Sequence, residues 1–306
     1  MIRTIFILLF SIVVVPLVSV LFGESLTNQQ VDILKTSALI ALGIALVCFA
    51  LSELTNNYSQ TDKIWSIAPV IYGWYIAYAG EWNERAVLMA VLITIWGVRL
   101  TYNFGRRGGY NWKFWTGEED YRWEVLRNND IFKGRKWRWK FFNLFFISLY
   151  QNGLIYLIVV PCIAVLSNSK NPLGIWDVLL SFALLGFVII EFIADKQQFV
   201  FQAKKHEILI SGKPLPEPYV TGFIKSGFWK YMRHPNYMAE QAVWICIYGF
   251  SVVATGDFIN WSMVGCLLLL ILFNSSADFS EGISAKKYPE YKDYQANVGR
   301  FLPKLN

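Results

Sequence analysis

Charged side chains are scarce in this 306-residue chain, and their scarcity excludes an ordinary soluble domain. Asp, Glu, Lys and Arg make up 16% of the residues, against about 25% in a typical soluble protein. Hydrophobic residues reach 55%, and the mean hydropathy is +0.37. A composition of this kind is typical of a chain that crosses a membrane several times.

Cysteine and histidine are also few, which argues against metal and disulfide chemistry. The chain holds four Cys and two His. The cysteines lie singly in apolar segments, without the spacing of a metal site or a redox pair. We therefore expect no metal site and interpret the cysteines as packing residues: Cys48, Cys162, Cys246 and Cys266.

The motifs of soluble nucleotide-binding domains are missing as well. The sequence contains no G-x-G-x-x-G after a strand and no P-loop. This excludes a soluble Rossmann domain, while a nucleotide held between membrane helices stays possible. The net charge of +6 does not require a nucleic acid, because basic residues beside anionic lipid headgroups account for it. We expect membrane lipids, and no nucleic acid, as partners.

Long apolar runs, by contrast, are abundant and predict an all-α bundle of seven or eight transmembrane helices in one integral membrane domain. A span needs about 20 mostly apolar residues. We divide the domain into N-terminal spans, 1–80, and a core, 81–306, with polar segments at 105–140, 195–235 and 274–306. The third and eighth candidates are short enough to be re-entrant. The eight candidate spans are 4–22, 34–54, 64–80, 86–104, 141–166, 174–194, 236–255 and 258–273.

The basic residues fall unevenly on alternate loops. With the N-terminus in the cytoplasm, 25 of the 28 Lys and Arg lie on the cytoplasmic side and 3 on the other. Cytoplasmic loops of membrane proteins carry the excess of Lys and Arg. The distribution therefore predicts that both termini face the cytoplasm. We expect the protein to be embedded in the endoplasmic reticulum membrane or a bacterial inner membrane.

One short run combines a helix start with a group of polar side chains. It reads Arg233-His234-Pro235-Asn236-Tyr237, with Glu240 after it. Proline is favoured in the first turn of a helix, so we expect a helix to begin at Pro235. A helix start offers free N–H groups and a partial positive charge, which suit a phosphate. The alternative interpretation is helix capping and anchoring at the membrane interface.

Two polar stripes leave predicted spans on the same side as this run. Ionisable groups at membrane depth usually face a bundle interior or a cavity. We therefore expect the stripes and the run to enclose a cation-rich pocket; the alternative is a set of interhelical salt bridges, such as Arg99 with Asp195. One stripe is Arg99, Tyr102, Asn103 and Arg106, and the other is Glu191, Asp195, Gln198 and Gln202.

Taken together, these residues resemble the steroid 5-alpha-reductase superfamily. Asn236-Tyr237-x-x-Glu240 is similar to its C-terminal motif, and Asp195 is similar to an Asp that follows an apolar span. The resemblance covers roughly residues 55–306. It is greatest to a branch of uncharacterised function, which shares Asp62-x-x-Trp65-Ser66, Trp96-Gly-Val-Arg99-Leu, Glu119-Asp120-x-Arg122-Trp123 and Asp195-Lys-Gln197-Gln198-x-x-Phe201.

The resemblance implies a helical membrane reductase that uses NADPH. Hydride would go to a C=C bond conjugated to a carbonyl in a lipid-soluble, sterol-like substrate. The implied catalytic residues are Asp62, as an acid for the carbonyl oxygen, with Tyr237 and Glu240 on the nicotinamide side. The implied cofactor contacts are Arg99, Arg106 and Arg107 to phosphates, Asp195 at the nucleoside end, Asn236 and Tyr237 on the nicotinamide side, and Tyr288 and Tyr291 closing over it, with Gln198, Arg233 and His234 as further cofactor contacts.

Two departures and two alternatives accompany this interpretation. Trp96 stands where steroid reductases carry a Tyr, and an indole cannot donate a phenolic proton. Gln198 and Gln202 stand where steroid enzymes have arginines. Isoprenylcysteine methyltransferases have a similar Arg-His-Pro-x-Tyr element, so a lipid methyltransferase that uses S-adenosylmethionine is one alternative. A non-enzymatic lipid-binding membrane protein is the other.

Overall fold

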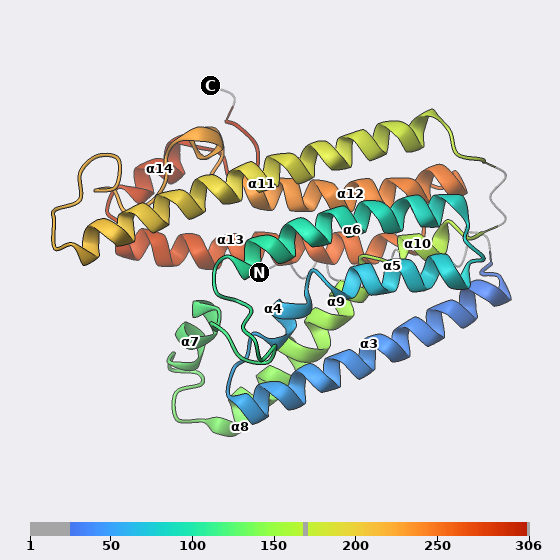
Figure 1. The fold of residues 1–306 in the computed structure, drawn as a ribbon, viewed down its shortest axis with the longest axis horizontal. Coiled ribbons are helices and arrows are strands. Elements are labelled where there is room, and N and C mark those ends of the chain that lie inside the picture. The colour runs from blue at the N-terminus through green and yellow to red at the C-terminus, as the bar shows by residue number, and fades with distance from the viewer. Residues whose placement is uncertain (1–24, 168–170, 305–306) are drawn as a thin grey trace. The chain divides into compact units, whose positions relative to one another are not determined.

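The computed structural model describes residues 25–167 and 171–304, and in this part of the chain it is all-helical (Figure 1). An isolated parallel bridge pairs Met232 with Gly299. The elements are α3 Asn28–Thr55, α4 Gln60–Ile64, α5 Ala68–Ala79, α6 Glu84–Gly105, α7 Tyr121–Arg127, α8 Lys136–Phe142, the π-helix η2 Asn143–Tyr150, α9 Gln151–Leu157, α10 Pro161–Ala164, α11 Ile175–Ile210, the 3₁₀-helix η3 Gly227–Lys230, α12 Pro235–Thr255, α13 Met263–Lys287 and α14 Tyr291–Asn297.

Six helices in the described residues are long and apolar enough to cross a membrane. This confirms a multi-pass integral membrane protein. The third predicted span, 64–80, contains the 12-residue α5, which is shorter than the roughly 17 residues that a span needs. The first, 4–22, lies outside the described residues. The six helices are Asn28–Thr55, Glu84–Gly105, Lys136–Ala164, Ile175–Ile210, Pro235–Thr255 and Met263–Lys287.

The helix ends follow local chemistry that hydropathy alone does not show. α3 begins before the predicted residue 34, because Thr27 and Gln30 form a capping box in which each side chain accepts the other's backbone N–H. α12 begins at Pro235, as predicted. α11 runs on to Ile210 instead of ending at residue 194, and its added turns carry polar side chains.

The fifth span contains an eight-residue π-helix, η2. Segments of this kind are rare and are frequently found at functional sites. Thr61 of α4 donates to the carbonyl of Ile147 at 3.1 Å, and Asn152 donates to the Thr61 hydroxyl at 3.2 Å. The short helix α4 is therefore tied to η2 and to the start of α9.

The described residues form two compact units, and neither is continuous in sequence. The first comprises residues up to Ser181 together with Cys246–Leu268, and the second comprises Phe182–Ile245 with Leu269–Asn306. In the first unit, α3 packs on η2 and α9, and α5 packs on α6. A buried ion pair, Arg85 with Asp177 at 2.7 Å, joins the start of α6 to the start of α11.

Candidate functional site

The run before α12 is held in place by the C-terminal segment of the second unit. The backbone N–H of Arg233 donates to the carbonyl of Gly299 at 2.8 Å, and that of His234 donates to the carbonyl of Arg300 at 3.0 Å. The Tyr294 hydroxyl donates to the carbonyl of Trp229. These bonds fix the backbone from which α12 starts.

The carboxylate of Glu281 on α13 organises the side chains of this run. It accepts from Arg233 Nε at 2.9 Å, and its Oε1 lies 2.8 Å from His234 Nε2. It also accepts from Gln295 at 2.8 Å, and Arg300 lies 3.4 Å away. Glu281 is 3% exposed. Arg233 and His234, which the sequence assigned to the cofactor, are thus engaged by a buried carboxylate that the sequence did not single out.

Asp195 contacts the first turn of α12, a pairing that the sequence did not predict. Asn236 Nδ2 donates to Asp195 Oδ1 at 3.1 Å, and Asp195 is buried. The Asn236 Oδ1 atom and the Gln198 Oε1 atom are both buried without a hydrogen-bond partner among the described residues. A buried acceptor without a donor costs about 1–3 kcal/mol. The second unit therefore has two amide oxygens that lack a donor and could accept a hydrogen bond from a ligand.

The other predicted residues of α12 pack within the same unit. The Tyr237 ring stacks on His234, with centroids 5.1 Å apart, and meets Phe273 edge-on at 4.9 Å. Glu240 is buried and accepts from the Trp244 indole at 3.0 Å. Both side chains therefore have fixed orientations.

The tail tyrosines form an aromatic cluster with Phe223. Tyr291 meets the Phe223 ring at 4.9 Å and is buried, and burial raises the pKa of its phenol to about 12. Tyr288 lies beside Phe223 at 5.9 Å, and the Lys205 ammonium lies 5.6 Å from the Tyr288 ring centroid. That these rings close over a cofactor stays a prediction.

In the first unit, the α6 stripe is continuous at its C-terminal end. Arg106 donates to Asn103 Oδ1 through Nε at 3.0 Å and Nη2 at 2.6 Å, and its guanidinium lies 5.7 Å from the centre of the Tyr102 ring. Arg99 is buried on the same helix, and Arg107 lies in the turn that follows it. The common face predicted from the i, i+3, i+4, i+7 spacing is thus confirmed for these three contacting residues.

Asp62 lies on α4 under a cap made by residues 110–123. Asp62 Oδ2 accepts from the Trp123 indole at 2.9 Å, and the backbone N–H of Asp120 donates to Ser59 at 2.9 Å. The Tyr110 hydroxyl donates to the carbonyl of Lys63 at 2.6 Å. Partial burial raises the pKa of the Asp62 carboxyl, the Asp120 carboxylate raises it further, and the Arg122 guanidinium opposes both. Asp62 is thus biased toward its protonated form.

One protein family has a sequence pattern that matches residues 48–298, and its description is "Protein of unknown function (DUF1295)". The chain belongs to the DUF1295 family. An uncharacterized protein of Schizosaccharomyces pombe is 34% identical over 279 residues, which are 88% of this chain and 79% of the yeast chain. No solved structure matches. The matched part of the DUF1295 chain includes α4, both polar stripes and Glu281.

Lys63 is a second feature of the DUF1295 chain that sequence analysis missed. Its side chain is 0% exposed, and its Nζ atom has no hydrogen-bond partner among the described residues. Burial lowers the pKa of the Lys63 amine, whereas the Asp62 and Glu119 carboxylates raise it. The resemblance pointed to Asp62, and periodicity over the five residues of α4 is too short to show that its neighbour is buried.

Replacing Lys63 by Met is expected to stabilise the DUF1295 chain by about 1–2 kcal/mol, because an amine buried without hydrogen bonds gives way to an apolar group of similar length. Lys63→Arg is the matched control and is expected to lower the melting temperature, because a guanidinium is larger and cannot lose its charge. Thermal unfolding of the detergent-purified variants measures both effects. If Met and Arg lower the melting temperature equally, the Lys63 amine makes a favourable interaction.

Proposed function

We propose that this DUF1295 protein is a membrane-embedded NADPH-dependent reductase of a C=C bond conjugated to a carbonyl in a lipid or sterol-like molecule. The observation that carries the proposal is the group of buried acceptors in the second unit. Asp195 already accepts a hydrogen bond from Asn236. The side-chain amide oxygens of Asn236 and Gln198 have no hydrogen-bond donor among the described residues. The resemblance to the steroid 5-alpha-reductase superfamily supplies the reaction class.

The residues present fit one part of NADPH well. Ribose hydroxyls and the amino groups of adenine and of the nicotinamide carboxamide are hydrogen-bond donors, which buried carboxylate and amide oxygens bind. Phosphates need cations instead, and Arg233 is already engaged by Glu281 and by backbone carbonyls. We therefore assign Asn236, Gln198 and Asp195 to the nucleoside or carboxamide groups. That Arg99, Arg106 and Arg107 bind the phosphates stays a prediction from the resemblance.

When bound, NADPH supplies the hydride. The protein's part is to orient both molecules and to manage a proton. Asp62 suits the proton because its pKa is raised, so that its carboxyl group holds a hydrogen near neutral pH more readily than an exposed Asp. Trp123 fixes the orientation of the Asp62 carboxyl group by donating to Oδ2. Tyr237 and Glu240 remain candidates on the nicotinamide side.

Replacing Asn236 by Ala is expected to weaken NADPH binding about tenfold or more, because a buried hydrogen bond to the cofactor is lost. Binding raises the melting temperature of the detergent-purified protein by mass action, so a titration by thermal shift measures it. Asn274→Ala is the matched control, since the Asn274 amide donates to its own helix at Leu270. We expect the control to bind NADPH like the wild type.

The same titration with NADH and S-adenosylmethionine tests the competing functions. A shift with NADPH that Asn236→Ala abolishes supports the reductase. A shift with S-adenosylmethionine alone contradicts it and favours a lipid methyltransferase. If none of the three molecules shifts the wild-type protein, a non-enzymatic lipid-binding role replaces the proposal.

A further inference from the structure

A run of cations stands at the start of the fifth span, in the first unit. Residues 131–140 contain five basic side chains and no acidic one. All five are exposed. Two tryptophans, Trp137 and Trp139, alternate with these cations, which are Lys133, Arg135, Lys136, Arg138 and Lys140.

The two tryptophans show which face of this helix is turned toward the protein. Trp139 is buried in a cluster with Tyr58, Trp123 and Ile147. Trp137 is 73% exposed, and the same face continues through Phe141 at 59% and Phe145 at 58%. These three residues follow the i, i+4, i+8 spacing of one helical stripe.

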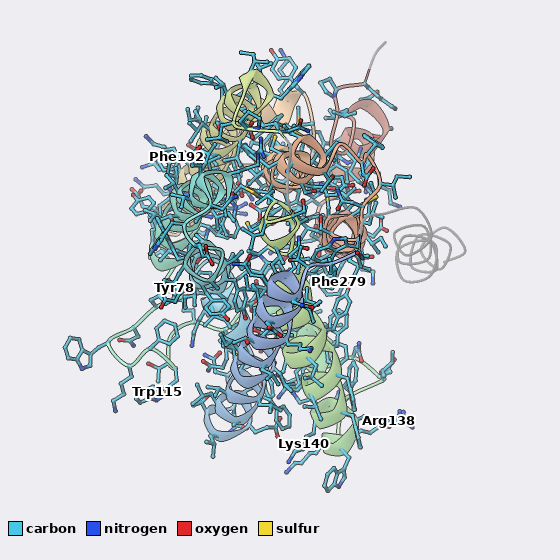
Figure 2. The ribbon with its side chains drawn as sticks, turned by 90° about the vertical axis from the view of Figure 1, so that its right-hand side faces the viewer. Tyr78, Trp115, Arg138, Lys140, Phe192 and Phe279 are labelled. Atoms are coloured by element: carbon cyan, nitrogen blue, oxygen red, sulfur yellow. The ribbon has the colours of Figure 1, made fainter. Side chains whose placement is uncertain are left out.

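This exposed stripe belongs to the span-length helix Lys136–Ala164. An exposed aromatic stripe on a membrane helix faces lipid, and tryptophan is enriched at the level of the headgroups. Trp137 therefore places the first turn of α8 at the membrane interface. Figure 2 shows the Arg138 side chain extending outward from this end of the helix.

The cations near Trp137 are not neutralised by the part of the chain that the structure describes. Lys140 lies 3.9 Å from Glu53, a loose ion pair. Within residues 25–167 and 171–304, no ion pair engages Lys133, Arg135, Lys136 or Arg138. These four cations lie in the first turn of α8 and in the residues just before it, where they repel one another. Binding an external anion relieves that repulsion.

We propose that Lys133, Arg135, Lys136 and Arg138 bind the phosphate groups of anionic phospholipids. The charge selects an anion, and the adjoining Trp137 and Phe141 select one that is attached to acyl chains. A cluster of four or more Lys and Arg immediately beside a span is the pattern that recognises anionic headgroups. This inference does not depend on the proposed reductase activity.

The test compares the variant Lys136→Gln/Arg138→Gln with the matched control Lys213→Gln/Lys292→Gln, which removes two exposed cations elsewhere. Each protein is placed in nanodiscs of phosphatidylcholine alone or mixed with phosphatidylglycerol. Lipids retained after extraction are counted by native mass spectrometry. Because each cation near an anionic leaflet changes affinity about fivefold, the variant is expected to bind phosphatidylglycerol roughly 30-fold more weakly.

The control is expected to retain phosphatidylglycerol like the wild type, and all three proteins should melt alike in phosphatidylcholine. Equal retention by variant and control overturns the proposal. A further arm adds inorganic phosphate to phosphatidylcholine nanodiscs. Stabilisation by phosphate that matches the effect of phosphatidylglycerol also overturns it, because the site then takes free phosphate. If the double variant does not fold, Arg138→Gln alone is expected to show about a fivefold loss.

Discussion

Replacing Glu281 by Gln is expected to destabilise the protein by about 3–5 kcal/mol. Glu281 is 3% exposed and holds Arg233, His234 and Gln295 within 2.9 Å. Removing its charge leaves the Arg233 guanidinium, which is 10% exposed, without its carboxylate partner. Thermal unfolding in detergent measures the loss.

Glu290→Gln is the matched control for this experiment. Glu290 pairs with Lys225 at 2.9 Å, but both side chains are about half exposed. Such surface pairs contribute about 0–1 kcal/mol. If Glu281→Gln melts at the same temperature as Glu290→Gln, the Glu281 cluster is not the element that holds the C-terminal segment.

The second large effect is expected at Arg85 and Asp177 in the first unit. Arg85 donates to both oxygens of Asp177, at 2.7 and 2.9 Å, and also to the carbonyls of Asn171 and Pro172. The side chains are 4% and 2% exposed. Asp177→Asn therefore leaves a buried guanidinium with neutral acceptors alone and no counter-charge, which we expect to cost about 3–5 kcal/mol.

The double variant Arg85→Met/Asp177→Leu separates the charge from the packing. Because it removes both charges together, it is expected to be more stable than Asp177→Asn. Lys204→Gln is the surface control, since the Lys204–Glu207 pair is exposed, and its effect is expected to be within about 1 kcal/mol. A double variant that is less stable than Asp177→Asn would contradict this account.

The sequence predicted those parts of the structure that depend on local patterns. Hydropathy found the spans, since a membrane helix must be apolar over its length. The preference of proline for the first turn of a helix correctly predicted that α12 begins at Pro235. Helical spacing correctly predicted that Tyr102, Asn103 and Arg106 lie together. The short helix within 64–80, which the sequence marked as short enough to be re-entrant, has a physical cause. Its residues are apolar throughout, yet the helix is limited to Ala68–Ala79 by the turn that precedes it and by Gly80.

The candidate site was predictable only where its partners lie on one helix or resemble a known motif. The resemblance assigned both Asn236 and Asp195 to the cofactor, but at different ends of it, so it did not predict their hydrogen bond. Glu281 was not found, because nothing in the spacing of an acid 47 residues beyond His234 indicates that the two side chains meet. Lys63 was not found either. Its burial depends on residues 110–123, which lie over α4 only in the folded chain, so the local sequence does not indicate it.

The two units also bear on how this protein can be cut and recombined. The chain passes from one unit to the other between Ser181 and Phe182, between Ile245 and Cys246, and between Leu268 and Leu269. Each passage falls inside a helix, α11, α12 or α13. Exchanging one unit with that of a relative therefore needs three junctions within helices. A single crossover between two related genes would build one unit from segments of two different parents. We therefore expect the two units to be inherited together.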